Sequence, residues 1–435
     1  MTRSWRSSPP DVGRTLAEKI LLAHCEADEI APGDFVMVNV DVVMGNDLGG
    51  PHAARELVKM GVDRVFDPSK VVVVADHLMP AKDIRSAELL KALKAWCDRQ
   101  GVTYYDQGRG GIEHTVLCEE GWVVPGSMIV GADSHSCTYG ALGAFGTGMG
   151  ATDIAGAMAL GSFWQIIPGT IVVEFTGEKG AFVTGKDLIL ALIREIGVAG
   201  ATSMALEFVG DGAAALTVDE RLAVSNMAVE AGADTGIFPA DEVTAAYLEG
   251  RTDRPWTAER TDDDAEVAAR VRIDLGDVPP LVALPHSPGN VVPVSDAVGR
   301  KIDQVYIGNC ANGTITDLRQ AAEILRGRSV HRDCRAIIVP ASQRIYRQAL
   351  AEGLLDAFVE AGCVVMTPTC GACLGGHSGI IAPGETAITT TNRNFRGRMG
   401  SNEAFVHLAN AWVAAAAAVA GEIVHPAEIA GRVTA

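Results

Sequence analysis

Three cysteines have the spacing and the surroundings of metal ligands. Cys370 and Cys373 form a C-x-x-C pair, and Cys310 follows an apolar run in a turn rich in glycine and asparagine. Three thiolates without an obvious fourth suit a cubane iron–sulfur cluster that leaves one iron open to a substrate oxygen. His377 could instead complete a Cys3His zinc site. Read alone, the pair could also be a redox dithiol or two packed structural cysteines.

Acidic residues next to histidines are the candidates for acid–base chemistry. They are Asp76 with His77, Asp133 and Ser134 before His135, and His114 at the end of a glycine-rich segment. A neighbouring carboxylate orients an imidazole and raises its pKa, which favours proton donation. The alternative for each histidine is a structural role, which is less favoured here because two such groups follow neighbouring strands.

Three arginines, Arg393, Arg396 and Arg398, lie within six residues. Guanidinium groups bind carboxylates through two parallel hydrogen bonds. In a chain with 36 basic and 54 acidic residues and a net charge of −18, this group predicts a site for a small anion. A solvated turn is the alternative. The same net charge argues against nucleic-acid binding, which requires a basic surface.

Short β-branched runs alternate with amphipathic helical patterns, which predicts an α/β fold with largely parallel sheets. A helix is expected to begin near Thr15, and others to span residues 86–100 and 344–361. The predicted strands are 71–75, 127–131, 170–175, 304–308, 336–340 and 364–367. Candidate residues follow four of these strands, and ligands of open α/β sheets bind beyond the carboxyl ends of the strands. We therefore expect one convergent site.

The chain of 435 residues is long enough for two or three packed units. We expect a disordered leader over residues 1–14, an N-terminal α/β region of two subdomains over 15–280, and a C-terminal α/β domain over 281–435 that carries the cluster cysteines. The charged segment 251–266 and the proline-rich segment after 271–275 predict a linker between the two regions. Because no apolar run reaches the roughly 20 residues that a bilayer requires, and no secretory signal is recognisable, we expect a cytoplasmic protein without a membrane segment.

Residues 146–151 match the G-x-G-x-x-A pattern of a dinucleotide-binding loop only weakly. No clean strand precedes the pattern, and no acidic residue follows at the expected offset of about 20 residues. We interpret the glycines of segment 140–150 as points where backbones approach closely around the site.

Eight segments together resemble the aconitase superfamily, most closely its branch of large subunits of 3-isopropylmalate dehydratase and homoaconitase. The segments are VVADHLMP, GRGGIEH, GADSHSCTYGALGAFGTGMGATD, SNMAVEAGADTGIFPAD, PHSPGN, IGNCANGTITDLR, PTCGACLGGHSG and TTNRNFRGRMGS. They occur in this order, so the resemblance covers nearly the whole chain. It implies aconitase-like three-layer α/β/α domains around a central cluster site, without the swivelling fourth domain of the family.

The resemblance implies a [4Fe-4S] cluster bound by Cys310, Cys370 and Cys373, with the fourth iron not ligated by cysteine. The implied catalytic residues are Asp76, His77, His114, Asp133, His135 and Glu230, with Asp76 and His77 protonating the leaving hydroxyl group. The implied substrate-binding residues are Asn46, Asp47, Ser134, Asn226, Asn392, Arg393 and Arg398. The chain departs from the family beside the first cluster cysteine, at Asn309 and Ala311.

The resemblance also implies the reaction, which is isomerisation of a hydroxy di- or tricarboxylic acid by dehydration and rehydration. The expected substrate is 2-isopropylmalate, converted to 3-isopropylmalate in leucine biosynthesis. Homoaconitate and a 2,3-dimethylmalate type of substrate are alternatives, and a non-catalytic iron-sensing relative is an alternative of a different class. In the family, a serine on the swivelling domain removes the C–H proton. The implied partner is therefore a small subunit that carries this domain and its serine.

Overall fold

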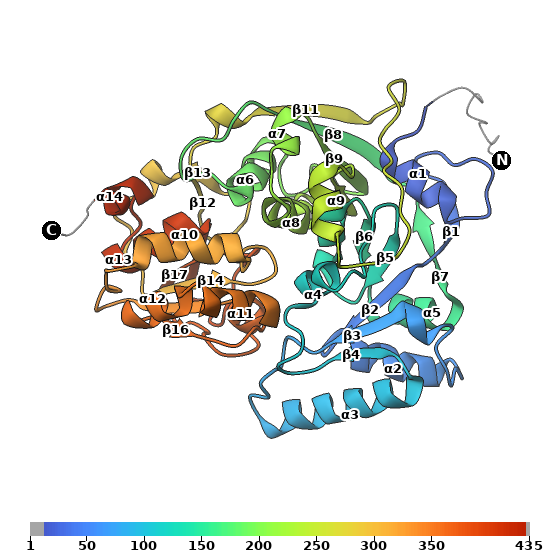
Figure 1. Cartoon of the computed structure of the whole chain (residues 1–435), viewed down its shortest axis with the longest axis horizontal. Helices are drawn as coiled ribbons and strands as arrows, with labels where there is room; N and C mark the ends of the chain where they lie inside the picture. Colours follow the sequence, from blue (N-terminus) through green and yellow to red (C-terminus); the bar gives the residue numbers. More distant parts are fainter. Residues whose placement is uncertain (1–12, 432–435) are drawn as a thin grey trace.

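The computed structural model describes residues 13–431, which form four sheets and the helices around them. In Figure 1 the first third of the chain lies mainly at the lower right, and the last third lies at the left. The strands and helices labelled β8, β9 and α6 to α9 lie above and between these two parts. The leader predicted for residues 1–14 lies outside the described residues, except that the backbone N–H of Arg14 donates to the Asp262 carboxylate at 2.9 Å.

A five-stranded parallel sheet with the order β4-β3-β2-β5-β6 forms the first part. Both of its faces are covered, because Val71 and Val73 of β3 pack in one core cluster and Val72 and Val74 pack in another. Successive side chains of a strand point to opposite faces, so a fully apolar strand is the expected sequence of such a sheet. The strands are β2 (Val42–Asn46), β3 (Val71–Val74), β4 (Thr103–Tyr105), β5 (Met128–Gly131) and β6 (Phe145–Gly148). The helices are α1 (Leu16–Ala23), α2 (Gly49–Lys59), α3 (Ile84–Gln100), α4 (Glu113–Glu119) and α5 (Ala151–Leu160), with short 3-10 turns η1 (Pro68–Lys70) and η2 (Ser134–Leu142).

Local sequence signals place the helices of this part close to their predicted positions. Thr15 caps α1 by a reciprocal pair of hydrogen bonds with Glu18, and Gly101 ends α3 in the left-handed conformation. Beside the sheet, β1 (Phe35–Asn39) and β7 (Ser162–Ile166) pair as a two-stranded antiparallel ribbon.

The second part is a four-stranded parallel sheet with the order β10-β9-β8-β11. Its strands are β8 (Gly169–Thr176), β9 (Met204–Val209), β10 (Thr235–Ile237) and β11 (Ala269–Asp274). Its helices are α6 (Gly185–Ile196), α7 (Asp211–Ala214), α8 (Val218–Asn226) and α9 (Glu242–Leu248), with the 3-10 turns η3 (Ala228–Ala231) and η4 (Leu275–Asp277).

The third part is a seven-stranded sheet with the order β13-β12-β18-β17-β14-β15-β16. Its strands are β12 (Leu281–Ala283), β13 (Val291–Pro293), β14 (Gln304–Gly308), β15 (Arg335–Val339), β16 (Val364–Val365), β17 (Thr386–Thr389) and β18 (Phe405–Ala409). Its helices are α10 (Ile315–Leu325), α11 (Gln343–Ala351), α12 (Leu354–Glu360), α13 (Ala411–Ala420) and α14 (Pro426–Ala430), with the 3-10 turns η5 (Val294–Asp296) and η6 (Gly371–Leu374). Within residues 13–431, no helix combines the length and the apolar character needed to cross a bilayer.

Two expectations differ from this architecture. Part of the proline-rich segment predicted as a linker forms β12 and β13, because β12 pairs antiparallel with β18 and buries its three side chains. The single helix predicted over residues 344–361 is two helices, since Gly353 adopts a φ of 68° between α11 and α12. Sheet membership changes between β11 and β12, and the domain boundary at residue 280 stays a prediction.

The glycines of segment 140–150 bring backbones into close approach, as predicted. A Cβ atom on Gly140 would lie 2.0 Å from the carbonyl oxygen of Gly236, and one on Gly148 would lie 2.4 Å from that of Asp133. Gly146 and Gly148 belong to β6 itself, so the weak dinucleotide pattern does not form a loop between a strand and a helix.

We expect Gly140→Ala to lower the free energy of unfolding by about 1–3 kcal/mol, because its methyl group would meet rigid backbone atoms. Urea unfolding measures this loss. The control is Gly156→Ala in α5, where an added Cβ meets no atom within 4 Å. That change should be neutral or stabilise by up to about 1 kcal/mol, as for glycine replaced in a helix. Equal stability of the two variants would contradict the close-approach interpretation.

Candidate active site

Three cysteine thiols line one cavity between the first and the third sheet. Cys310 follows β14, whereas Cys370 and Cys373 lie at the start of η6 and within it, after β16. All three side chains are buried. The cavity is lined by Asp76, His77, Ile112, Glu113, His114, Asp133, His135, Cys310, Cys370, Cys373, Asn392 and Arg398. The four strand ends that the sequence singled out therefore meet at one site.

The three thiols and His377 do not form a close group of zinc ligands. Within residues 13–431, the groups of three or more potential ligands whose donor atoms all lie within 4.8 Å of one another contain no cysteine. A tetrahedral zinc ion with bonds of about 2.3 Å would hold its sulfur ligands about 3.8 Å apart. His377, the proposed fourth zinc ligand, is engaged elsewhere, with its ring in contact with the Pro80 carbonyl and the Ser378 hydroxyl. The described residues therefore do not support the Cys3His zinc alternative.

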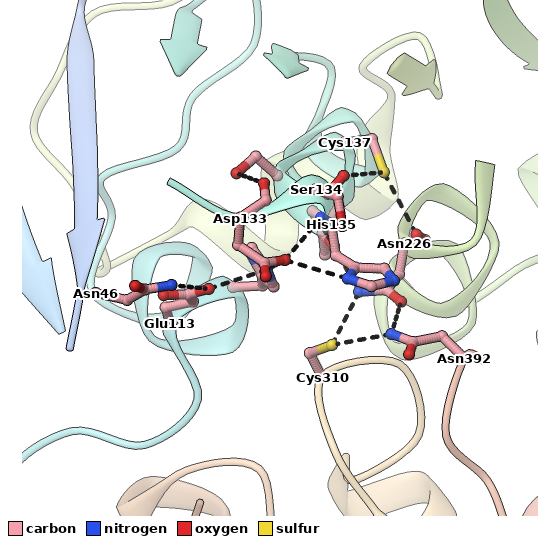
Figure 2. A network of polar contacts seen from close by, with 12 residues as sticks. Asn46, Glu113, Asp133, Ser134, His135, Cys137, Asn226, Cys310 and Asn392 are labelled. Carbon is pink, nitrogen blue, oxygen red and sulfur yellow. Dashed lines mark hydrogen bonds and ion pairs between the residues drawn. The ribbon is translucent and has the colours of Figure 1, made fainter. Parts of the chain in front are cut away.

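Amide side chains surround the thiols and donate to sulfur. Asn226 Nδ2 lies 3.2 Å from Cys310 Sγ, and Asn392 Nδ2 lies 3.4 Å from the same atom (Figure 2). The two amides also contact each other at 3.0 Å. Such outer contacts orient metal ligands and stabilise the charge on a thiolate, so both asparagines lie where the sequence-based proposal expected support for the site.

Asn309 shapes the turn that presents the first cysteine. Its backbone has a φ of 102°, a conformation that asparagine tolerates better than most side chains. Its Oδ1 accepts hydrogen bonds from the backbone N–H groups of Ala311 (2.9 Å) and Asn312 (3.1 Å), while its Nδ2 lies 3.7 Å from Cys373 Sγ. Both departures from the family pattern thus take part in one hydrogen-bonded turn around Cys310.

His77 is held between two buried carboxylates. Its Nδ1 lies 2.6 Å from Asp76 Oδ1 and 3.4 Å from Asp47 Oδ1. Asp47 also accepts from the backbone N–H groups of His77 and Leu78. Burial by itself would lower the pKa of His77, but the charge of Asp76 and the hydrogen bonds of both carboxylates raise it well above its ordinary value. The two carboxylates therefore favour the protonated form of the imidazole, the form that can donate a proton.

Asp133 connects the other two histidines. Its Oδ1 lies 3.1 Å from His114 Nε2. The same oxygen lies 3.1 Å from His135 Nδ1 (Figure 2). Burial would raise the pKa of Asp133, but the hydrogen bonds from both rings lower it well below its usual range. Burial lowers the pKa of His114, whereas hydrogen bonds to Asp133 and Glu230 outweigh burial and raise that of His135. The three imidazoles of the site therefore differ, because the pKa of His114 is lowered while those of His77 and His135 are raised.

Glu230 links this network to the arginine segment. It accepts from His135 Nε2 at 3.1 Å and from Arg393 Nε at 2.6 Å. A second cavity opens beside the first, with a volume of about 590 Å³. It is lined by Val198, Val229, Glu230, Leu374, Arg393, Phe395, Arg396, Gly397 and Arg398. Arg398 lines both cavities, so its side chain lies between the open cavity and the one that the thiols line.

The remaining predicted residues lie around this centre. Asn46, at the end of β2, donates to Glu113 Oε1 at 3.2 Å and accepts from the backbone N–H groups that begin α2. Ser134 follows Asp133 at the start of η2, and its backbone carbonyl is 3.9 Å from the Cys137 thiol. Sequence reasoning missed Glu113, although it stands directly before His114 and could have been found as an acidic neighbour of a candidate histidine.

Comparisons with known proteins agree with this arrangement. A model of the aconitase family (aconitate hydratase) matches residues 18–421. The chain is 70% identical to the "3-isopropylmalate dehydratase large subunit 2" of Rubrobacter xylanophilus, covering 95% of this chain and 98% of that protein. It is 52% identical to the corresponding large subunit of Desulfitobacterium hafniense, covering 95% and 99%. The crystal structure of Thermococcus kodakaraensis aconitase X is similar in fold, with a TM-score of 0.52, 14% identity and coverage of 89% and 92%.

The chain belongs to the aconitase family, which confirms the resemblance noted in the sequence. It is a hydro-lyase, an enzyme that removes water from its substrate and adds it back, and membership of the family implies a [4Fe-4S] cluster. Within the family, the two relatives from Rubrobacter xylanophilus and Desulfitobacterium hafniense are named as large subunits of 3-isopropylmalate dehydratase.

Proposed function

We propose that this chain is the large, catalytic subunit of an enzyme that isomerises 2-isopropylmalate to 3-isopropylmalate by dehydration and rehydration. The observation that carries the proposal is the 70% identity over 95% of the chain to a relative named for this activity. Further relatives at 48–52% identity have the same name. No feature of the described residues favours homoaconitate or a dimethylmalate instead.

We further propose that Cys310, Cys370 and Cys373 bind the [4Fe-4S] cluster and leave one iron without a cysteine ligand. The three thiols are buried and line one cavity, and the amides beside them suit charged sulfur. When bound, the cluster supplies a Lewis acid that polarises the hydroxyl group to be lost. Because a thiol must lose its proton to bind metal, and burial raises the pKa of Cys310, assembly of this site depends on pH.

Side chains of this chain supply the proton and bind the anionic substrate. The protonated His77, oriented by Asp76, donates to the departing hydroxyl oxygen and takes the proton back when water adds to the neighbouring carbon. His114, Asp133 and His135 hold the water in the cavity through their linked hydrogen bonds. In the adjoining cavity Arg393 and Arg398 bind the substrate carboxylates.

The proposed partner is a small subunit that carries a swivelling domain and the serine that removes the C–H proton. The relatives are named as large subunits, which implies a small one.

All nine cysteines are free thiols, which suits a reducing compartment such as the cytoplasm.

The test of the proposed function is anaerobic reconstitution of the chain with its small subunit, followed by an assay with 2-isopropylmalate. Turnover of a different hydroxy acid in preference to this one would overturn the assigned substrate.

Arg393→Gln should lower kcat/KM for isopropylmalate by at least about 100-fold. The change removes a group that binds a substrate carboxylate, and it also removes the ion pair that holds Glu230. Arg393→Lys keeps the charge but loses the planar fork, so it should recover only part of the activity. Iron and sulfide contents should match the wild type. Arg335→Gln, which breaks an exposed ion pair with Glu385, is the control and should change neither property. Loss of iron in Arg393→Gln would show a structural role instead.

A further inference from the structure

Glu113 is a buried acid of the cavity that the mechanism above does not use. It begins α4 and is 1% exposed, and its backbone N–H donates to Asp76 Oδ2 at 2.9 Å. Its Oε1 accepts from Asn46 Nδ2. Among the described residues, its Oε2 has no hydrogen-bond partner, although the atom is buried. A buried oxygen without a partner is costly, which suggests that a ligand completes its hydrogen bonding.

The carboxyl group of Glu113 lies close to both His77 and Asp133. A carboxyl oxygen of Glu113, a ring nitrogen of His77 and a carboxyl oxygen of Asp133 all lie within 4.8 Å of one another. Glu113 therefore stands between the acid that protonates the leaving group and the network that holds water, and it lines the same cavity as the three thiols.

The surroundings decide the charge of this group. Burial raises the pKa of Glu113 well above its ordinary value, and the negative charges of Asp76 and Asp133 raise it further. A carboxylic acid that is kept neutral in such a site can donate a hydrogen bond at neutral pH. An ionised carboxylate at this place would repel an anionic substrate, whereas the neutral acid offers it a proton.

We propose that Glu113 contacts the substrate directly and donates a hydrogen bond from Oε2 to an oxygen of the bound hydroxy acid. The identity of that acid rests on the proposed function, but the donor role of Glu113 does not. Oε1 is already engaged, by Asn46 Nδ2 at 3.2 Å and by His114 Nε2 at 3.4 Å, so Oε2 is the oxygen left to bind a ligand.

The test compares Glu113→Gln with Glu113→Ala in the reconstituted two-subunit enzyme. The glutamine amide keeps a donor at the same place, so kcat/KM should stay within about threefold of the wild type, while alanine should lose about tenfold or more, equivalent to one hydrogen bond. Iron and sulfide should be unchanged in both. Equal loss in the two variants would show that the ionised carboxylate is required, and no loss in alanine would show that Oε2 contacts nothing; either result overturns the proposal.

A second measurement needs no substrate. The infrared spectrum of the large subunit holding its cluster should contain a carbonyl band of a protonated carboxylic acid that disappears in Glu113→Gln. The control is Glu119→Gln, which removes a buried acid of the same helix that does not line the cavity. Burial raises the pKa of Glu119 to about 7, so this variant should lose a separate band, keep the band assigned to Glu113 and leave kcat/KM unchanged. Absence of the Glu113 band at neutral pH would overturn the proposal. If isopropylmalate is not turned over, the proposed substrate fails, and the infrared measurement still decides the state of Glu113.

Discussion

Replacing Cys370 by serine should reduce the iron content of the anaerobically reconstituted chain from about four atoms per chain to nearly none, and abolish turnover. The thiol lies at the start of η6, where its backbone N–H is fixed by the Asp76 carbonyl at 2.9 Å. A serine hydroxyl at this place is a poor ligand for iron, because soft thiolates are the preferred ligands of such clusters. Iron and acid-labile sulfide analysis measures the loss.

The matched control for this experiment is Cys363→Ser. Cys363 is also buried in the third part of the chain, but it packs in the hydrophobic core and does not line the cavity. This variant should keep its iron, its sulfide and its activity, with only a modest loss of stability. A full complement of iron and sulfide in Cys370→Ser would exclude Cys370 as a ligand, whereas zinc without sulfide in the wild type would contradict the cluster itself.

Replacing His77 by asparagine should lower kcat by about 100- to 10,000-fold, the usual contribution of a general acid. The ring lies between Asp76 and Asp47, which keep it protonated, and asparagine cannot supply that proton. Iron and sulfide should not change, since His77 is not a proposed ligand. Rates with saturating isopropylmalate and the small subunit measure the effect.

The control for His77 is another histidine that is paired with a carboxylate. His24 Nε2 lies 2.8 Å from Asp41, and the pair lies outside the cavity. His24→Asn should leave kcat unchanged. A similar loss of kcat in both variants would indicate a general effect on folding, and near-normal kcat in His77→Asn would exclude this residue as the acid.

The pH dependence of the rate is an independent test of His77 as the general acid. A histidine with a raised pKa is protonated below that pKa, so donation by His77 persists through neutral pH and is lost as the pH rises through the raised value. The wild-type rate should therefore fall on the alkaline side, and the residual rate of His77→Asn should lack this decline. If the wild-type rate already fell with rising pH at a midpoint below pH 7, and His77→Asn lacked this fall, the result would contradict a raised pKa of His77.

The sequence by itself determined the chemistry and the approximate place of most site residues. Cys310, Cys370 and Cys373 were recognisable because cysteine thiolates are the usual ligands of iron–sulfur clusters. The strands before the polar residues were recognisable because β-branched runs bury both faces of a sheet. Parallel strands present their carboxyl ends at one edge, so a convergent site followed from local patterns. Close approach at Gly140 and Gly148 also followed from composition.

Only the tertiary structure decided which partners meet. Asp47 joins His77 across 30 positions of the chain, and Glu230 joins His135 across 95, so no local spacing indicates either pair. The strands within the proline-rich segment depend on pairing with β18, and the free oxygen of Glu113 depends on what surrounds it in the folded cavity. Local sequence specifies which groups a residue offers and the backbone it favours. Burial, hydrogen-bond partners and pKa are instead set by neighbours that are distant in the chain and that only folding brings together.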